Sequence, residues 1–136
     1  MQKPEAIDEE FFFDGGKIVS ETDLRGIITY ANRQFCTISG YSLSELLEQP
    51  HNIVRHPDMP KAAFEQMWKE LRMGKDWHGY VKNLRKDGRY YWVDTHISPV
   101  YDQTNKITGY IAARGLPERK NIEQVIEQYN KLSAVE

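Results

Sequence analysis

Apolar and polar residues alternate with the period of a β-strand in five parts of the chain. These segments are rich in β-branched and aromatic residues, and they span residues 17–22, 27–31, 77–84, 89–100 and 106–114. The tetrapeptide Asp23-Leu24-Arg25-Gly26, between the first two, has the composition of a hairpin turn. The last three segments follow one another with only short turns between them, so they are expected to pair antiparallel.

Between the second and third strand-like segments, the apolar spacing becomes helical. A short helix is expected at 32–38, and another starts after Ser42, which forms a capping-box spacing with Glu45. The strongest helical pattern lies between Pro60 and Gly74, and its apolar stripe consists of Ala63, Phe64, Met67, Trp68 and Leu71. The order of elements predicts an α+β domain: a five-stranded antiparallel sheet with helices packed on one face.

The two ends of the chain differ from this central domain, which is expected to span residues 17–116. Residues 1–16 are acidic and then aromatic, and three adjacent phenylalanines at 11–13 are unfavourable in water, so a cap on the sheet is expected rather than a flexible tail. Residues 117–136 form a linker or signalling helix. Its apolar residues recur at spacings of three and four, which favours a coiled-coil seam and a homodimer over docking on its own domain; they are Ile122, Val125, Tyr129 and Leu132.

The composition narrows the class of protein. The chain has 136 residues, of which 40% are hydrophobic and 28% charged, and its net charge is −2. These values suit one soluble domain and offer no basic face for nucleic acid. No apolar run approaches the roughly 20 residues that cross a bilayer, and the acidic N-terminus is unlike a secretory signal. The expected location is the cytoplasm, either as a free protein or as the input domain of a membrane-anchored receptor.

The chain lacks the usual signs of catalysis. It has no phosphate-binding loop, no nucleophile elbow and no metal-spaced His/Glu pair, so it is not expected to be an enzyme. Its single cysteine, Cys36, excludes an internal disulfide.

Several motifs resemble one family. The segment 28–32 is similar to the start of PAS domains in general. The run QPHNIVRHPDMPKAAF at 49–64 gives a more specific resemblance. It is similar to the aerotaxis-receptor class of PAS domains, found at the input end of bacterial chemotaxis transducers. The segments 75–79 (KDWHG) and 81–83 (VKN) resemble the same class. The resemblance covers roughly residues 17–116.

This resemblance implies a non-covalent flavin, FAD rather than FMN, between the sheet and the central helices. It also implies a downstream transducer or signalling module, in cis or in trans, that receives the redox or oxygen status. Carried over by position, the cofactor-binding residues are Asn32, His51, Arg55, His56, Asp58, Phe64, Trp77 and Asn83.

The chemistry of these residue types suits a flavin, although each has another interpretation. Phe64 and Trp77 can form the apolar walls of a slot for the flat ring, or can simply pack in the core. The amide of Asn83 can both donate to and accept from the ring edge, unless it points to solvent. Arg55 can hold a pyrophosphate with its bidentate fork, unless its loop is simply solvated. Asp58 can orient Arg55 or His56, cap the following helix, or do both.

Three rival functions remain. The light-sensing LOV branch of PAS domains needs a cysteine in the central helices, but residues 52–55 contain none, and Cys36 is expected to pack in the earlier helix. A heme sensor needs an axial histidine on the long helix or in the loop before it; residues 60–73 contain none, while the loop contains His51 and His56. A ligand-free dimerisation or interaction module is the third.

Overall fold

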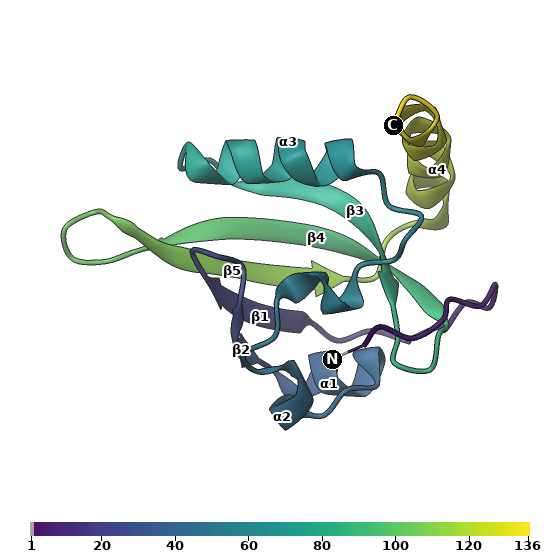
Figure 1. Cartoon of the computed structure of the whole chain (residues 1–136), viewed down its shortest axis with the longest axis horizontal. Coiled ribbons are helices and arrows are strands. Elements are labelled where there is room, and N and C mark those ends of the chain that lie inside the picture. Colours follow the sequence, from purple (N-terminus) through teal and green to yellow (C-terminus); the bar gives the residue numbers. More distant parts are fainter. Residues whose placement is uncertain (1) are drawn as a thin grey trace.

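Five strands form one antiparallel sheet in the order β2-β1-β5-β4-β3 (Figure 1). The computed structural model describes residues 2–136. The strands are β1 (Ile18–Asp23), β2 (Ile28–Ala31), β3 (Trp77–Leu84), β4 (Tyr90–Tyr101) and β5 (Ile107–Gly115). Each lies within a few residues of its predicted position, and the expected α+β fold is confirmed. The sheet order brings β1 and β5 together at its centre, although they are more than 80 residues apart in the chain.

Helical segments connect β2 to β3 and follow β5. They are α1 (Arg33–Ser39), α2 (Leu43–Leu46), the 3-10 helix η1 (His51–Val54), α3 (Lys61–Arg72) and α4 (Arg119–Ser133). The predicted capping box is present, since Ser42 accepts from the backbone of Glu45 and Glu45 accepts in return. Gly40 ends α1 with a φ of 82°, a left-handed conformation that glycine adopts without a Cβ penalty.

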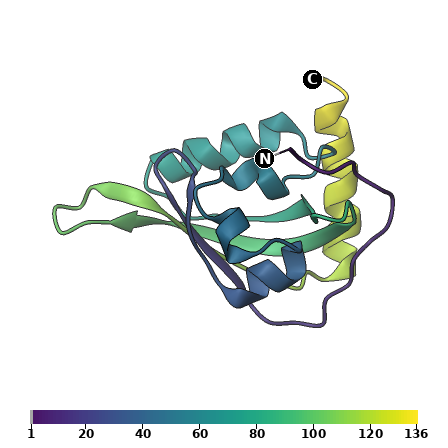
Figure 2. The same ribbon diagram turned by 60° about the horizontal axis from the view of Figure 1, so that its bottom comes forward.

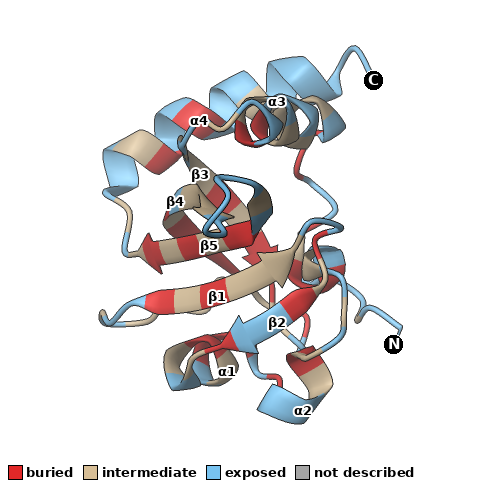
Figure 3. Ribbon diagram, turned by 90° about the vertical axis from the view of Figure 1, so that its left-hand side faces the viewer, coloured by how far each residue is buried: buried red, intermediate tan, exposed pale blue. Residues whose placement is uncertain are grey.

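The inner face of the sheet carries the main core. Helix α3 runs beside β3 and β4, while α1 and α2 lie beside β1 and β2 (Figures 1 and 2). Buried residues alternate with less buried ones in the first half of β1 and the second half of β5, coloured red and tan in Figure 3. The fully buried members of this core include Ile18, Ile28, Phe35, Ile38, Leu46, Tyr91 and Val93.

The N-terminal segment lies along the turn between β3 and β4. The backbone N–H of Phe11 donates to the carbonyl of Tyr90 at 2.7 Å. Phe13 packs edge-on against Tyr91, with 6.4 Å between ring centroids. Phe12 points outward and is 72% exposed. Phe11 and Phe13 therefore pack against the main core, whereas the Phe12 ring lies 5.8 Å from the Arg119 guanidinium. The expected cap at 1–16 also includes Met1, which lies outside the described residues.

Helix α4 packs on the outer face of its own sheet. Ile122 and Val125 are buried against Trp92, and the Tyr129 ring stacks on the same indole. The Tyr129 hydroxyl also donates to the carbonyl of Tyr80 at 2.6 Å. This differs from the inter-chain seam expected from the heptad spacing. The physical reason is that Trp92 offers a large apolar surface on the outer face, which the same helical stripe covers within one chain.

The far end of α4 touches the start of α3. The backbone N–H groups of Lys61 and Ala62 donate to the carboxylate of Glu136 at 3.1 and 3.0 Å. Pro60 occupies the N-cap position of α3 and offers no side chain that accepts a hydrogen bond. The Glu136 carboxylate therefore caps α3 from a distant part of the chain, which also suits the positive end of the helix dipole. No helix within residues 2–136 combines the length and the apolar character that a bilayer span requires.

The docking of α4 makes Val125 important for stability. Val125→Asp should lower the free energy of unfolding by at least about 2 kcal/mol, because it places an unpaired carboxylate against Trp92. Urea denaturation of this variant and of Gln124→Asp, at an exposed neighbouring position, measures the effect. Unchanged stability combined with a lower hydrodynamic mass would instead place Val125 in an interface between chains.

Candidate functional site

A cavity of about 290 Å³ lies between the inner face of the sheet and the segments η1 and α3. Alternate residues of β1, β3, β4 and β5 form one side, and η1 and α3 form the other. Leu24 and Arg25 of the β1–β2 turn, Asn52 of η1 and Arg72 of α3 line it and are solvent-exposed, so they mark its mouth. The volume is close to the lower end of the range for small-molecule sites, about 300–1,000 Å³.

The cavity is positively charged. Four arginines line it, and no aspartate or glutamate does among the described residues; the four are Arg25, Arg55, Arg72 and Arg114. Arg25 pairs with Asp23 at 3.4 Å, whereas the other three form no ion pair with any residue in the range 2–136. A concave site lined by one sign of charge attracts the opposite sign, so an anionic ligand is favoured here.

Arg114 is the most buried of these cations, with 6% of its surface exposed. Its Nη2 donates to Ser20 Oγ at 3.0 Å and to His51 Nε2 at 2.8 Å. Because a guanidinium only donates, Nε2 of His51 accepts and the imidazole is neutral. Burial lowers the pKa of Arg114 to about 10. Burial and the nearby Arg114 charge together lower the pKa of His51 to about 3.

Several buried polar atoms of the cavity have no hydrogen-bond partner within residues 2–136. They are Thr22 Oγ1, Arg55 Nε, Thr95 Oγ1 and Arg114 Nη1. Leaving such an atom unpaired costs about 1–3 kcal/mol each, so native structures usually satisfy them. Atoms of this kind around one cavity fit a ligand with several acceptors, such as the oxygens and nitrogens of a flavin nucleotide.

Four of the predicted site residues meet in this cavity: His51, Arg55, Phe64 and Asn83. The Arg55 guanidinium lies 3.7 Å from the centroid of the Phe64 ring, a cation–π contact that fixes both side chains. Arg55 and Asn83 form an isolated antiparallel bridge through their backbones. The η1 loop and β3 are thereby held together where the cavity needs polar groups.

The other four predicted residues do not line the cavity. Asn32 caps α1, since its Oδ1 accepts from the N–H of Phe35 at 3.0 Å and from that of Val19 at 3.1 Å. Trp77 lies on the inner face and packs against both the main core and a second buried cluster of Met67, Leu71 and Tyr110. Its ring covers Gly79, where an added Cβ would come within 2.3 Å of the indole.

His56 and Asp58 stabilise the loop before α3 instead of facing the cavity. The His56 ring is buried and packs edge-on against Tyr90. Its Nδ1 accepts from the backbone N–H of Asp58 at 3.0 Å. Burial and the nearby Lys82 charge lower the pKa of His56 to about 4. The Asp58 carboxylate is exposed and accepts from Lys82 Nζ at 3.0 Å.

The comparison with known families agrees with this architecture. Residues 28–114 match the family model described as the PAS fold. The chain belongs to the PAS fold family. It is 47% identical to the aerotaxis receptor of Escherichia coli K12 over 121 residues, which are 89% of this chain and 24% of the receptor. The chain spans about a quarter of the length of the first curated relatives that it matches.

Solved PAS-type structures share the fold. The light state of the blue-light photoreceptor Aureochrome1 LOV superposes with a TM-score of 0.74 at 22% identity, covering 83% of this chain and 91% of that one. A light-oxygen-voltage domain studied with a flavin analogue gives a TM-score of 0.70 at 26% identity, covering 85% and 87%. In this PAS domain Cys36 lies on α1, packs against the main core and does not line the cavity. Burial raises the pKa of its thiol.

The sequence did not single out Arg114, Arg72 or Thr95 of this PAS domain as site residues. For Arg114 a signal was available, because Tyr110, Ala112 and Arg114 alternate on the buried face of a predicted strand. An arginine at an inward strand position is uncommon unless something compensates its charge. Thr95 lies two positions after Val93 on the inner side of β4, by the same alternation.

Proposed function

We propose that this PAS domain binds a flavin in the cavity, FAD in preference to FMN, and reports redox or oxygen status to a downstream signalling module. The observation that carries the proposal is the cavity itself, lined by four arginines, by no carboxylate among the described residues, and by unpartnered buried polar atoms. The names of two related proteins point the same way: one is an aerotaxis receptor, and the other was studied with a flavin analogue.

Each part of the cavity has a distinct task in this proposal. Phe64 and Trp68 supply aromatic surface for the ring, and the Asn83 amide donates to and accepts from its polar edge. Arg25 and Arg72 at the mouth, with Arg55 behind them, suit the phosphates that extend toward solvent. Bound flavin supplies electron-transfer chemistry. Arg114 stabilises negative charge in the cavity, because it is buried without a carboxylate partner.

The sheet offers a route from the cavity to α4. Asn83 and Thr95 line the cavity from β3 and β4, and Tyr80 and Trp92 of the same two strands contact α4 on the outer face. A change in the hydrogen bonds of Asn83 would shift this strand pair and alter the packing of α4 on the outer face of the sheet. The receiving module is in cis or in trans, in the cytoplasm, and two copies of the domain work as a homodimer.

Heme is a weaker candidate for this cavity. Among the described residues His51 is the one histidine that lines it, and its Nε2 already accepts from Arg114. Axial ligation by that nitrogen would leave a buried guanidinium without this acceptor, at a cost of about 1–3 kcal/mol or more.

The proposal predicts a yellow protein whose flavin depends on Arg55. Purified protein should release FAD on denaturation, identified by absorption and chromatography. Arg55→Ala should lower FAD affinity by about 10- to 150-fold, equivalent to about 1.5–3 kcal/mol for one charge-assisted contact. Arg33→Ala, at an exposed position of α1, is the control. Asn83→Ser should keep some flavin and chiefly shift its reduction potential.

Two results would count against this function. Colourless protein that takes up neither FAD nor FMN would favour a ligand-free interaction module, and a Soret band would favour heme. Full FAD retention in Arg55→Ala, with unchanged preference over FMN, would make the loop from His51 to Pro60 structural.

A further inference from the structure

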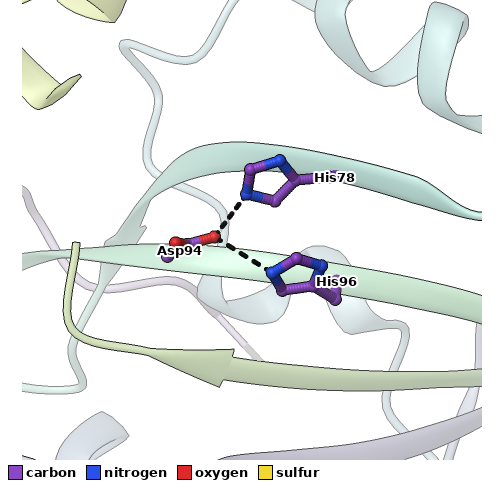
Figure 4. Close-up of side chains that lie close together, drawn as sticks. All are labelled: His78, Asp94 and His96. Atoms are coloured by element: carbon purple, nitrogen blue, oxygen red, sulfur yellow. Dashed lines mark hydrogen bonds and ion pairs between the residues drawn. The ribbon is translucent and has the colours of Figure 1, made fainter.

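Three side chains with metal-binding chemistry lie close together, as Figure 4 shows. They are on the outer face of the sheet, because their positions alternate with those of the cavity-lining Asn83 and Thr95. His78 of β3 and His96 of β4 are direct cross-strand partners, and Asp94 lies two positions before His96 on the same face. Asp94 Oδ1 lies 2.6 Å from His78 Nε2 and 3.5 Å from His96 Nε2. The two imidazole rings stack with 4.2 Å between centroids and 14° between planes.

The donor atoms are nearly close enough for one ion. One ring nitrogen of each histidine and one carboxylate oxygen all lie within 4.8 Å of one another. Donors at about 2.0–2.1 Å from a tetrahedral zinc ion are about 3.3 Å apart, so each donor needs to move by about 1 Å or less. Side-chain rotation supplies such a shift without a change in the paired strands that carry the three residues.

The cluster is also open to solvent. The side chains of His78, Asp94 and His96 are 48%, 30% and 65% exposed. An ion can therefore enter without unfolding the strands, and water can complete its coordination. Nearby Lys82 is engaged elsewhere, since its ammonium pairs with Asp58 at 3.0 Å.

We propose that His78, Asp94 and His96 form a binding site for a divalent transition-metal ion, with Zn²⁺ as the reference ion. Two imidazoles and one carboxylate are a donor set that suits Zn²⁺ and its neighbours, whereas Ca²⁺ and Mg²⁺ prefer all-oxygen sites. Three protein ligands leave a fourth position open, as in exchangeable rather than closed structural sites. The site does not depend on the proposed flavin, because its residues lie on the other face of the sheet.

The location of the site gives it a route to the cavity. Thr95 lies between Asp94 and His96 in β4, and its side chain lines the cavity with an unpartnered hydroxyl. An ion held by both strands would restrain the β3–β4 pair at this point, so the metal has a direct physical path to the ligand site.

The test uses the full chain without a polyhistidine tag. Equilibrium dialysis against ZnCl₂, with metal analysis, should find one ion per chain. His78→Asn and His96→Asn should each weaken zinc binding by at least about tenfold, because loss of even an outer-shell partner costs 10- to 100-fold. Glu123→Gln, an exposed carboxylate on α4, is the matched control and should bind as the wild type does.

A second readout covers the case in which a variant folds poorly. At the same concentration, Zn²⁺ should raise the melting temperature of the wild type and of Glu123→Gln by more than that of His96→Asn. Co²⁺ should give the intense visible bands of a low-symmetry site with nitrogen donors. Absence of zinc binding by the wild type, or equal affinity in all variants, would reduce the cluster to a hydrogen-bonded surface pair. Neither result depends on whether the protein contains flavin.

Discussion

Arg114→Met should weaken flavin binding and, at the same time, stabilise the ligand-free domain. The guanidinium is buried with no carboxylate partner among the described residues, and one of its N–H groups has no acceptor. Burial lowers the pKa of Arg114 from 12.5 to about 10, which corresponds to a cost of about 3 kcal/mol for the charged form. Methionine fills much of the same space without that cost.

The two effects have different origins. The free energy of unfolding of the ligand-free protein should rise by about 1–3 kcal/mol, because Ser20 and His51 keep their own hydrogen bond at 3.1 Å. Flavin affinity should fall by about 10- to 150-fold, because the ligand loses a buried cation. Urea unfolding of stripped protein and titration with FAD separate them.

Arg33→Met, at an exposed position of α1, should change neither quantity. Loss of stability with undiminished flavin binding in Arg114→Met would show that Arg114 holds β5 to β1 and has no role toward the ligand.

Acid should destabilise the ligand-free domain well above the pH at which carboxylates protonate. The pKa of His51 is lowered from 6.5 to about 3, and that of His56 from 6.5 to about 4. At pH values below 6.5 and above the folded-state pKa of each histidine, the unfolded chain binds protons that the folded domain does not. The free energy of unfolding therefore falls as the pH falls through this range. From pH 7 to pH 5, the two groups together should cost about 4 kcal/mol.

Unfolding by urea at several pH values measures this slope. His51→Gln and His56→Gln should each remove about half of the loss between pH 7 and 5, and the double variant should be nearly flat there. The Asp87 carboxylate, whose pKa is lowered to about 2 mainly by Arg89, acts only at lower pH and does not interfere. A slope that persists in the double variant would assign the acid sensitivity to other groups.

Local signals in the sequence were sufficient for the elements of the fold. The capping box at Ser42, the proline before α3 and the glycine after it act over a few residues, and alternation along β4 directly sets which side chains face inward. The position of α4 was harder to predict. Its apolar stripe has the same period whether it meets a second helix or Trp92 of its own sheet.

The site could be predicted only in part, because the cavity is assembled across the sheet order. Arg114 reaches Ser20 because β5 pairs with β1, a pairing that no local pattern reveals. The polar groups of Asn32 and Asp58 found partners close by, in a helix cap and in Lys82, and so do not face the cavity. Arg55, Phe64 and Asn83 were found through a resemblance in sequence, which carries such non-local information.

The Glu136 cap on α3 is a physical link between the cavity wall and the segment that follows α4. Helix α3 supplies Phe64 and Met67 to the cavity wall, and its first turn is capped by the carboxylate of Glu136, three residues beyond α4. If a ligand favours this capped arrangement by some factor, then a protein that draws α4 away must lower the affinity for that ligand by the same factor. Occupancy of the cavity would then depend on which partner holds the helix, and a ligand affinity measured on the isolated domain would apply only to the capped arrangement.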